Sequence, residues 1–371
     1  MDDGDATTTT TWQYFQRYGG QVILAPCLYV QLVYYVAWSR ATRPPYSWDE
    51  QKLSPQSPSA LRYAVPVSAI LAASCMLLLP MSLYEIESVS PLWNAGLRVV
   101  CFFYACKSLD LGVARRHDPP TRLVDKADGT GTEPAPLQNS RDISTYARKL
   151  ATEMRYHSFD IAAKQKDRPE TSNPQTDLLW TLGPIVVLPT LTYLIPISAL
   201  KCATLLLVIQ LGLEALHKLV HLRCPHPLFW RPWAARTMSD FWTTHWHSAA
   251  APFLYSLAYA PTKRLLAPLL GKQGGRAAGV LAAFSLSGVW HGWASAPAVT
   301  RPWLLGFQVW ALFMGFGVAS LVERWVWGKR QGGWVQRGVV WSVALGGAGV
   351  CARTLECYCR VEWVRRTQCP A

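Results

Sequence analysis

Long apolar blocks constrain the fold of this chain more than any other feature of its sequence. A helix needs roughly 20 apolar residues to cross about 30 Å of hydrocarbon. Clear blocks of that length are Gln21–Trp38, Leu61–Tyr84, Leu178–Leu200, Cys202–Leu222, Ala277–Pro297 and Trp303–Val322. Weaker blocks are Pro91–Val113 and Gly338–Ala352. The sequence therefore predicts an all-α, multi-pass integral membrane protein with about eight transmembrane helices.

The excess of basic residues indicates membrane topology rather than a nucleic-acid partner. The formal net charge is +13, but in membrane proteins lysine and arginine gather in the cytoplasmic loops. Basic residues follow alternate apolar blocks, whereas the opposite loops carry Glu85 and Glu87 or are as short as Lys201. An arrangement with both termini in the lumen fits this alternation, although the arginines of the C-terminal tail run against it. We expect membrane lipid as a partner and no nucleic acid.

The polar segments indicate one membrane domain with an insertion. Residues 115–177 form the long polar stretch, which we expect to be cytoplasmic. Within it, residues 118–136 look unstructured, whereas Arg141–Lys149 suits a surface helix. Arg223–Arg276 is too polar for a plain span and too apolar for a solvent loop, so it suits interfacial or re-entrant helices. We predict a single integral membrane domain over residues 1–371.

Cysteine and histidine spacings do not indicate a metal centre. Cys357 and Cys359 are too close for a CxxC site, although the tail cysteines are able to form disulfides if the tail is lumenal. Glu214, His217 and His221 share a helix face, so a metal site is geometrically possible there. A membrane di-iron oxidase would need further paired histidine boxes, and the eight histidines include no adjacent pair. We expect no bound metal.

His291 is an ionisable residue inside an apolar block, Ala277–Pro297. Such a residue is costly in a membrane and is a functional-site candidate by default. Gly288 and Gly292 flank it and permit close helix approach or room for a ligand. A structural role, with the ring hydrogen-bonded to a neighbouring helix, has about equal weight for a lone histidine. As a general base, such a residue contributes roughly 10²–10⁴-fold in rate.

A polar and aromatic cluster lies upstream of His291, at Ser239–His247. Ser239 and Asp240 are N-cap residue types, so we expect a helix to begin there. In that helix Phe241 would share a face with His245, and Trp242 with Trp246 (i, i+4), while His247 points elsewhere. An interfacial aromatic belt would explain the tryptophans. A belt does not require the histidine pair.

The two motifs, in this order, resemble the wax synthase-like branch of the membrane-bound O-acyltransferases. The similarity covers Ser239–His247 and Ser287–Gly292, and the branch includes fungal acetyltransferases of terpenoid and mycotoxin pathways. The family usually has Gly-Arg-Arg or similar where this chain has Thr243-Thr244-His245. The resemblance therefore leaves open whether His245 substitutes for an arginine.

The resemblance implies transfer of an acyl group from acyl-CoA to a hydroxyl in a tunnel that crosses the membrane. His291 would be the general base, and His247 would orient the thioester or stabilise the oxyanion. The implied substrate-binding residues are Asp240, Phe241, Trp242, His245, Trp246 and Trp290. The candidate residues for the CoA phosphates are Lys263, Arg264, Lys272 and Arg276. Acyl-CoA, in particular acetyl-CoA, would be a co-substrate, and no cofactor would be bound.

We therefore expect an acetyltransferase of the endoplasmic reticulum that acts on a lipophilic secondary metabolite such as a terpenoid. One alternative is a wax ester synthase that acts on long-chain alcohols. Another is a non-catalytic transporter or scaffold. Transport would be favoured by paired half-length segments in both halves, and the sequence shows no such symmetry.

Overall fold

The computed structural model describes residues 11–42, 59–83, 90–125, 132–135, 137–161, 211–215, 217, 228, 235–246, 249–328, 333–358 and 360. The predicted span Leu178–Leu200 and most of Cys202–Leu222 lie outside these ranges. The chain divides into two compact units, Met1–Pro119 and Pro120–Ala371.

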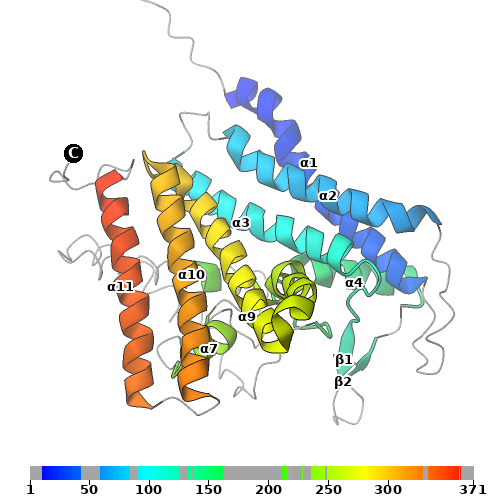
Figure 1. Ribbon diagram of the computed structural model, residues 1–371. Coiled ribbons are helices and arrows are strands. Elements are labelled where there is room, and N and C mark those ends of the chain that lie inside the picture. The colour runs from blue at the N-terminus through cyan, green and yellow to red at the C-terminus, as the bar shows by residue number, and fades with distance from the viewer. Residues whose placement is uncertain are drawn as a thin grey trace, which may run out of the picture. The chain divides into compact units, whose positions relative to one another are not determined.

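The first unit is helical. It contains α1 (Thr11–Ala41), α2 (Ser59–Ser82), α3 (Pro91–Leu109) and a π-helical turn, η2 (Asp110–Ala114) (Figure 1). Helix α2 packs against both α1 and α3. A Cβ atom at Gly112 would lie 2.3 Å from the Cβ of Ala69, so only glycine allows η2 to approach α2 this closely. Three of the predicted apolar blocks therefore form helices that pack together.

The polar insertion has its own small core. Helix α4 (Ser140–Thr152) confirms the predicted surface helix, and β1 (Leu123–Asp125) pairs antiparallel with β2 (Thr132–Pro134). The prediction that residues 118–136 are unstructured was wrong for the two strands. Tyr146 on α4 packs edge-on against Phe159, with the ring centroids 5.3 Å apart. Arg122, next to β1, forms an isolated antiparallel β-bridge with Phe159. The small aromatic core therefore orders a segment whose prolines disfavour regular structure.

The second unit also contains the helices that carry both sequence motifs. In chain order these are α7 (Met238–Asp240), η4 (Phe241–His245), α8 (Ala251–Leu254), η5 (Tyr255–Tyr259), α9 (Ala260–Ser295), η6 (Ala296–Ala298), α10 (Pro302–Trp327) and α11 (Trp334–Tyr358). Helix α10 lies between α9 and α11 (Figure 1). Elements η4 and η5 are π-helical turns.

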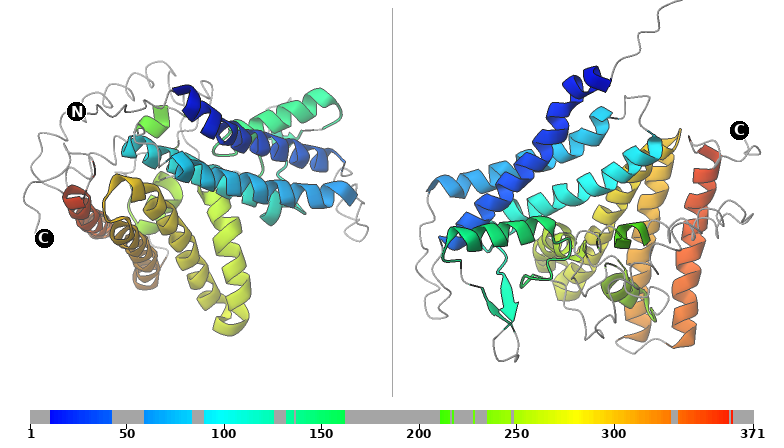
Figure 2. Two further views of the ribbon diagram at one scale, coloured as in Figure 1. Left: turned by 90° about the horizontal axis from the view of Figure 1, so that it is seen from above. Right: turned by 180° about the vertical axis from the view of Figure 1, so that it is seen from behind.

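Helix α9 is a hairpin of two arms that lie side by side (Figure 2). Gly271 breaks the helix with φ 72° and ψ 172°, a conformation that glycine adopts readily. A Cβ atom at Gly275 would lie 2.8 Å from Ala267 Cα, and one at Gly279 would lie 2.9 Å from the carbonyl oxygen of Tyr259. The second arm therefore runs back along the first, and it ends near His291.

The second arm of α9 also packs closely against α10. A Cβ atom at Gly292 would lie 2.9 Å from the carbonyl oxygen of Gly306, and one at Gly288 would lie 2.9 Å from Trp310 Cα. The small residues around His291 thus allow the two backbones to approach, as small residues do at membrane helix interfaces.

Among the described helices, three are long and apolar enough to cross a membrane: Val22–Ala41, Ala60–Ser82 and Pro302–Trp327. The described part of the chain is mostly helical, which agrees with the predicted class of membrane protein. The blocks Ala277–Pro297 and Gly338–Ala352 are helical as well, within α9–η6 and α11. The number of about eight spans stays a prediction.

Candidate active site

His291 lies near the end of α9 with its ring held by one hydrogen bond. The Nδ1 atom is 2.8 Å from the carbonyl oxygen of Ser287, one turn earlier. A carbonyl oxygen only accepts, so Nδ1 carries the hydrogen in this bond. In the neutral imidazole the lone pair then lies on Nε2. The local fold thus sets the tautomer and leaves Nε2 as the basic atom.

Aromatic rings surround His291. Its ring stacks on Phe313 of α10, with the centroids 4.5 Å apart and the planes at 29°. Trp290 lies beside it at 5.1 Å and is itself buried against Phe253. These rings form apolar walls around the histidine.

The Ser239–His247 motif begins with a short capped helix. Thr237 is the N-cap residue, and its hydroxyl accepts the N–H of Asp240 at 2.9 Å. The prediction of Ser239 or Asp240 as the cap was wrong, because the helix already begins at Met238. A threonine two residues before the expected position supplies the same oxygen acceptor.

The middle of the motif is a π-helical turn. The N–H of Trp246 donates to the carbonyl oxygen of Phe241 at 2.7 Å, so residues five apart become neighbours. Phe241 accordingly stacks on Trp246, with the centroids 5.3 Å apart and the planes at 17°. His245 Nε2 lies 3.3 Å from Asp240 Oδ2. The expected pairing of Phe241 with His245 assumed ordinary α-helical spacing.

Both motifs meet on the same ring of α10. Trp242 lies 5.6 Å from Phe313, centroid to centroid, and Phe313 is the ring on which His291 stacks. Trp242 also packs against Phe316 and Phe284. Sequence reasoning missed Phe313, because one phenylalanine among the apolar residues of a span carries no distinguishing signal.

The indole N–H of Trp242 is buried and has no hydrogen-bond partner among the described residues. A buried donor without a partner costs roughly 1–3 kcal/mol. Such groups call for an explanation such as strain, catalysis or an unseen ligand. The Trp242 N–H is therefore a candidate donor to a substrate.

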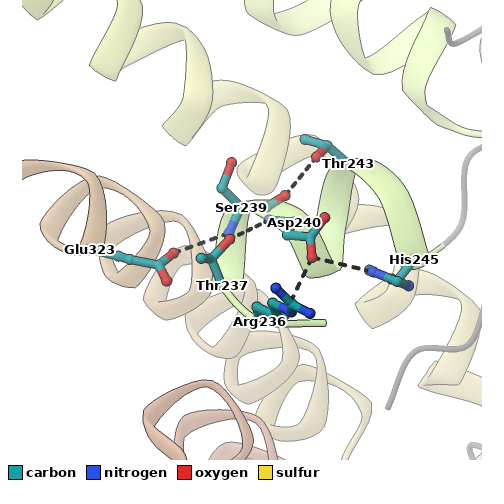
Figure 3. A network of polar contacts seen from close by, with 7 residues as sticks. All are labelled: Arg236, Thr237, Ser239, Asp240, Thr243, His245 and Glu323. Atoms are coloured by element: carbon teal, nitrogen blue, oxygen red, sulfur yellow. Dashed lines mark hydrogen bonds and ion pairs between the residues drawn. The ribbon is translucent and has the colours of Figure 1, made fainter. Parts of the chain in front are cut away.

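A second residue that sequence reasoning missed is Glu323 of α10. Its side chain is buried, and Oε2 accepts the backbone N–H of Ser239 at 3.2 Å (Figure 3). In the same network, Asp240 Oδ2 accepts the N–H of Arg236 at 3.3 Å. The sequence did contain a signal, since Glu323 is a carboxylate inside the apolar segment Pro302–Trp327.

The four basic candidates are not brought into this cluster. His247 lies outside the described residues. The basic candidates Lys263 and Arg264 lie on the first arm of the α9 hairpin, and Lys272 and Arg276 on the second. At about 1.5 Å rise per residue, Arg276 and His291 are roughly 22 Å apart along the helix axis.

Glu214 and His217, two of the three residues of the possible metal site, are both buried. Glu214 Oε2 accepts the backbone N–H of Leu228 at 2.7 Å. Among the described residues, no group of three or more potential ligands is arranged to hold a metal ion. The third residue of the pattern, His221, lies outside the described ranges.

Comparison with known proteins identifies the same region. Residues 224–314 match the Membrane bound O-acyl transferase family. This range contains the α7–η4 segment, the hairpin, His291 and Phe313. The match supports a membrane-bound O-acyltransferase relationship for this part of the chain.

Two relatives from Arabidopsis thaliana are similar to this chain. Probable long-chain-alcohol O-fatty-acyltransferase 1 is 29% identical over 130 residues, which are 34% of this chain and 38% of the relative. Probable long-chain-alcohol O-fatty-acyltransferase 2 is 35% identical over 65 residues, which are 18% of this chain and 19% of the relative. The matched part thus spans less than two fifths of either relative. The likeness supports a wax synthase-like affiliation.

Proposed function

We propose that this protein is a membrane O-acyltransferase that moves an acyl group from acyl-CoA to the hydroxyl of a lipophilic alcohol. The observation that carries the proposal is the contact of both motifs with Phe313: His291 stacks on this ring, and Trp242 packs against it. The family match over residues 224–314 spans both motifs and supports the same chemistry.

In the proposed reaction, Nε2 of His291 takes the proton of the alcohol. The alcohol oxygen attacks the thioester carbon, and the carbon–sulfur bond breaks. The proton on His291 then passes to the departing sulfur, which gives the ester and free CoA. No covalent acyl-enzyme forms, so the reaction needs no serine or cysteine nucleophile.

The developing negative charge on the thioester oxygen needs hydrogen-bond donors. The buried N–H of Trp242 has no partner in the described part of the chain, which makes it a candidate donor. His247 is the second candidate, on the resemblance of its motif. One such donor often contributes 10²–10³-fold in rate.

For the substrates, we propose acetyl-CoA as the donor and a lipophilic secondary metabolite such as a terpenoid as the acceptor. The motifs resemble the fungal acetyltransferase branch, which supports this choice, and the endoplasmic reticulum is the corresponding location. The second candidate is wax ester synthesis, because both relatives are named as probable long-chain-alcohol O-fatty-acyltransferases.

An acyl-transfer assay on membranes that contain the protein tests the proposed function. We expect transfer of label from acetyl-CoA or a long-chain acyl-CoA to an alcohol, and the preferred donor distinguishes the two candidates. His291→Ala should abolish transfer, because the reaction loses its base, while the amount of protein stays the same. His117→Ala, which changes an exposed histidine of the first unit, is the matched control. Full activity in His291→Ala would exclude the proposed role of this residue.

A further inference from the structure

Glu323 is a buried carboxylate on a helix that is apolar enough to span a membrane. It is 9% exposed and lies within Pro302–Trp327. An acidic group in such a helix is expensive and marks a functional site by default. The mechanism proposed above makes no use of Glu323. The presence of this costly carboxylate in α10 therefore calls for another role.

The contact of Glu323 suggests what this role is. Oε2 accepts the N–H of Ser239, one of the N-terminal N–H groups that no carbonyl within the short α7–η4 helix is able to bind. The next N–H, that of Asp240, donates to the hydroxyl of Thr237 at 2.9 Å. A negative charge is also favoured at the N-terminus of a helix. Glu323 therefore binds the beginning of the motif to α10 (Figure 3).

Helix α10 holds the motif at a second place. Phe313 and Phe316 pack against Trp242, with centroid distances of 5.6 and 5.2 Å. The other side of the site uses the same helix, because His291 stacks on Phe313. Two points of attachment fix the orientation of the segment more firmly than the aromatic contact alone.

We propose that Glu323 is a positioning residue for acyl transfer. Its carboxylate fastens the beginning of the Met238–His245 segment to α10, and this fixes Trp242 and the rest of the motif relative to His291. The inference rests on the proposed function, since it assigns Glu323 a part in the same site. Glu323 acts through the Ser239 backbone and does not touch the substrate.

Two substitutions at Glu323 separate the hydrogen bond from the bulk of the side chain. Glu323→Met keeps similar volume and helix propensity but removes the acceptor. Glu323→Gln removes the charge and keeps an oxygen that is able to accept the Ser239 N–H. Glu356→Met is the matched control, because Glu356 is a buried carboxylate on α11.

Two measurements on purified protein in lipid nanodiscs test the proposal. The first is kcat and KM for the acyl-CoA and the alcohol. The second is amide hydrogen exchange of the peptide that covers residues 238–246, which reports on the segment without any need for activity.

In Glu323→Met we expect faster amide hydrogen exchange in this peptide and a kcat that is lower by roughly 10–100-fold. The reason is that small misplacements of groups near a reacting centre reduce the rate by up to about 10²-fold. Both KM values should change much less. Glu323→Gln should restore slow exchange and most of the activity. Glu356→Met should leave kcat and the exchange of this peptide as in the wild type.

Unchanged exchange or unchanged kcat in Glu323→Met would overturn the proposal. The proposal also fails if Glu323→Gln is as impaired as Glu323→Met, because the hydrogen bond would then not be what matters. If the wild-type protein transfers no acyl group, the proposed function fails and Glu323 has no catalytic segment to position. The exchange comparison would still show whether Glu323 holds the segment on α10.

Discussion

At the scale of single residues, His291 combines a fixed tautomer with an aromatic surrounding. The hydrogen bond from Nδ1 to the Ser287 carbonyl leaves the lone pair on Nε2. The ring stacks on Phe313 and lies in a tilted contact with Trp290. The sequence alone gives a structural and a catalytic role equal weight, and the proposed role as base would use Nε2.

Trp242 offers a residue-scale prediction. Trp242→Phe keeps an aromatic ring but removes the buried N–H that has no partner in the described part of the chain. If this N–H binds the oxyanion, kcat should fall on the order of 10²-fold while KM changes little, because the interaction exists mainly in the transition state. Steady-state kinetics in membranes or nanodiscs measure both constants.

The control for this variant is Trp341→Phe. Trp341 of α11 packs against Phe241 at a centroid distance of 6.1 Å, so it belongs to the same aromatic cluster. This variant should keep the wild-type kcat. Equal losses in the two variants would indicate that packing, rather than the Trp242 N–H, matters for catalysis.

At the scale of elements, the π-helical turn η4 decides which side chains of the motif meet. An ordinary helix would bring residues four apart together, as the sequence pattern predicted. The additional residue in the turn brings His245 to Asp240 and Trp246 to Phe241. The predicted contact of Trp242 with Trp246 is still made, at a centroid distance of 6.3 Å. His245 thus interacts with a carboxylate of its own motif.

The contact between α9 and α10 gives an element-scale prediction. Gly292→Ala places a Cβ atom 2.9 Å from the carbonyl oxygen of Gly306, and backbone atoms yield poorly. We expect a loss of roughly 1–3 kcal/mol in the free energy of unfolding, as for other overpacked positions. Activity should fall as well, because His291 precedes Gly292 and would move relative to Phe313. Thermal unfolding in detergent measures the stability.

Gly315→Ala on α10 is the matched control, because a Cβ atom there meets nothing within 4 Å. Alanine is favoured over glycine inside helices by about 1 kcal/mol, so this variant should be at least as stable as the wild type. If Gly292→Ala were as stable as Gly315→Ala, the prediction would be wrong. The result would show that α9 and α10 can move apart with little loss in the free energy of unfolding.

At the scale of the whole molecule, the basic residues and the tail bear on topology. The candidate CoA-binding residues lie on both arms of the α9 hairpin, near the turn at Gly271. Cys357 at the end of α11 is disulfide-bonded, whereas Cys351 is free. Disulfides persist in oxidising compartments, so a lumenal tail, as predicted, would be compatible with this bond.

The hairpin charges give a prediction for donor binding. We expect Lys272→Gln and Arg276→Gln each to raise the KM for acyl-CoA by up to about fivefold at low salt, since an exposed charge pair contributes roughly 0.2–1 kcal/mol. Added salt should narrow the difference from the wild type, because it screens exposed charges. Initial rates at several salt concentrations measure this effect.

Arg353→Gln, which changes an exposed arginine on α11, should leave the KM for acyl-CoA unaltered. A KM for acyl-CoA that stays constant in the Lys272 and Arg276 variants at low salt would assign these residues to membrane topology alone.

The sequence by itself indicated a helical membrane protein and the candidate site of its chemistry. Long apolar blocks have few stable forms other than helices in a membrane, and His291 is conspicuous because a membrane makes an ionisable group costly. Both signals are local, so they are readable without the fold. The described blocks did form helices.

Only the tertiary structure decided how the site is assembled. Phe313 and Glu323 lie far along the chain from the Ser239–His247 motif, and their contacts depend on how α10 packs against α9 and the η4 turn. The hairpin at Gly271 and the pairing of β1 with β2 likewise depend on close backbone approach and on a small aromatic core. Packing between distant segments is a property of the fold, and no local pattern encodes it.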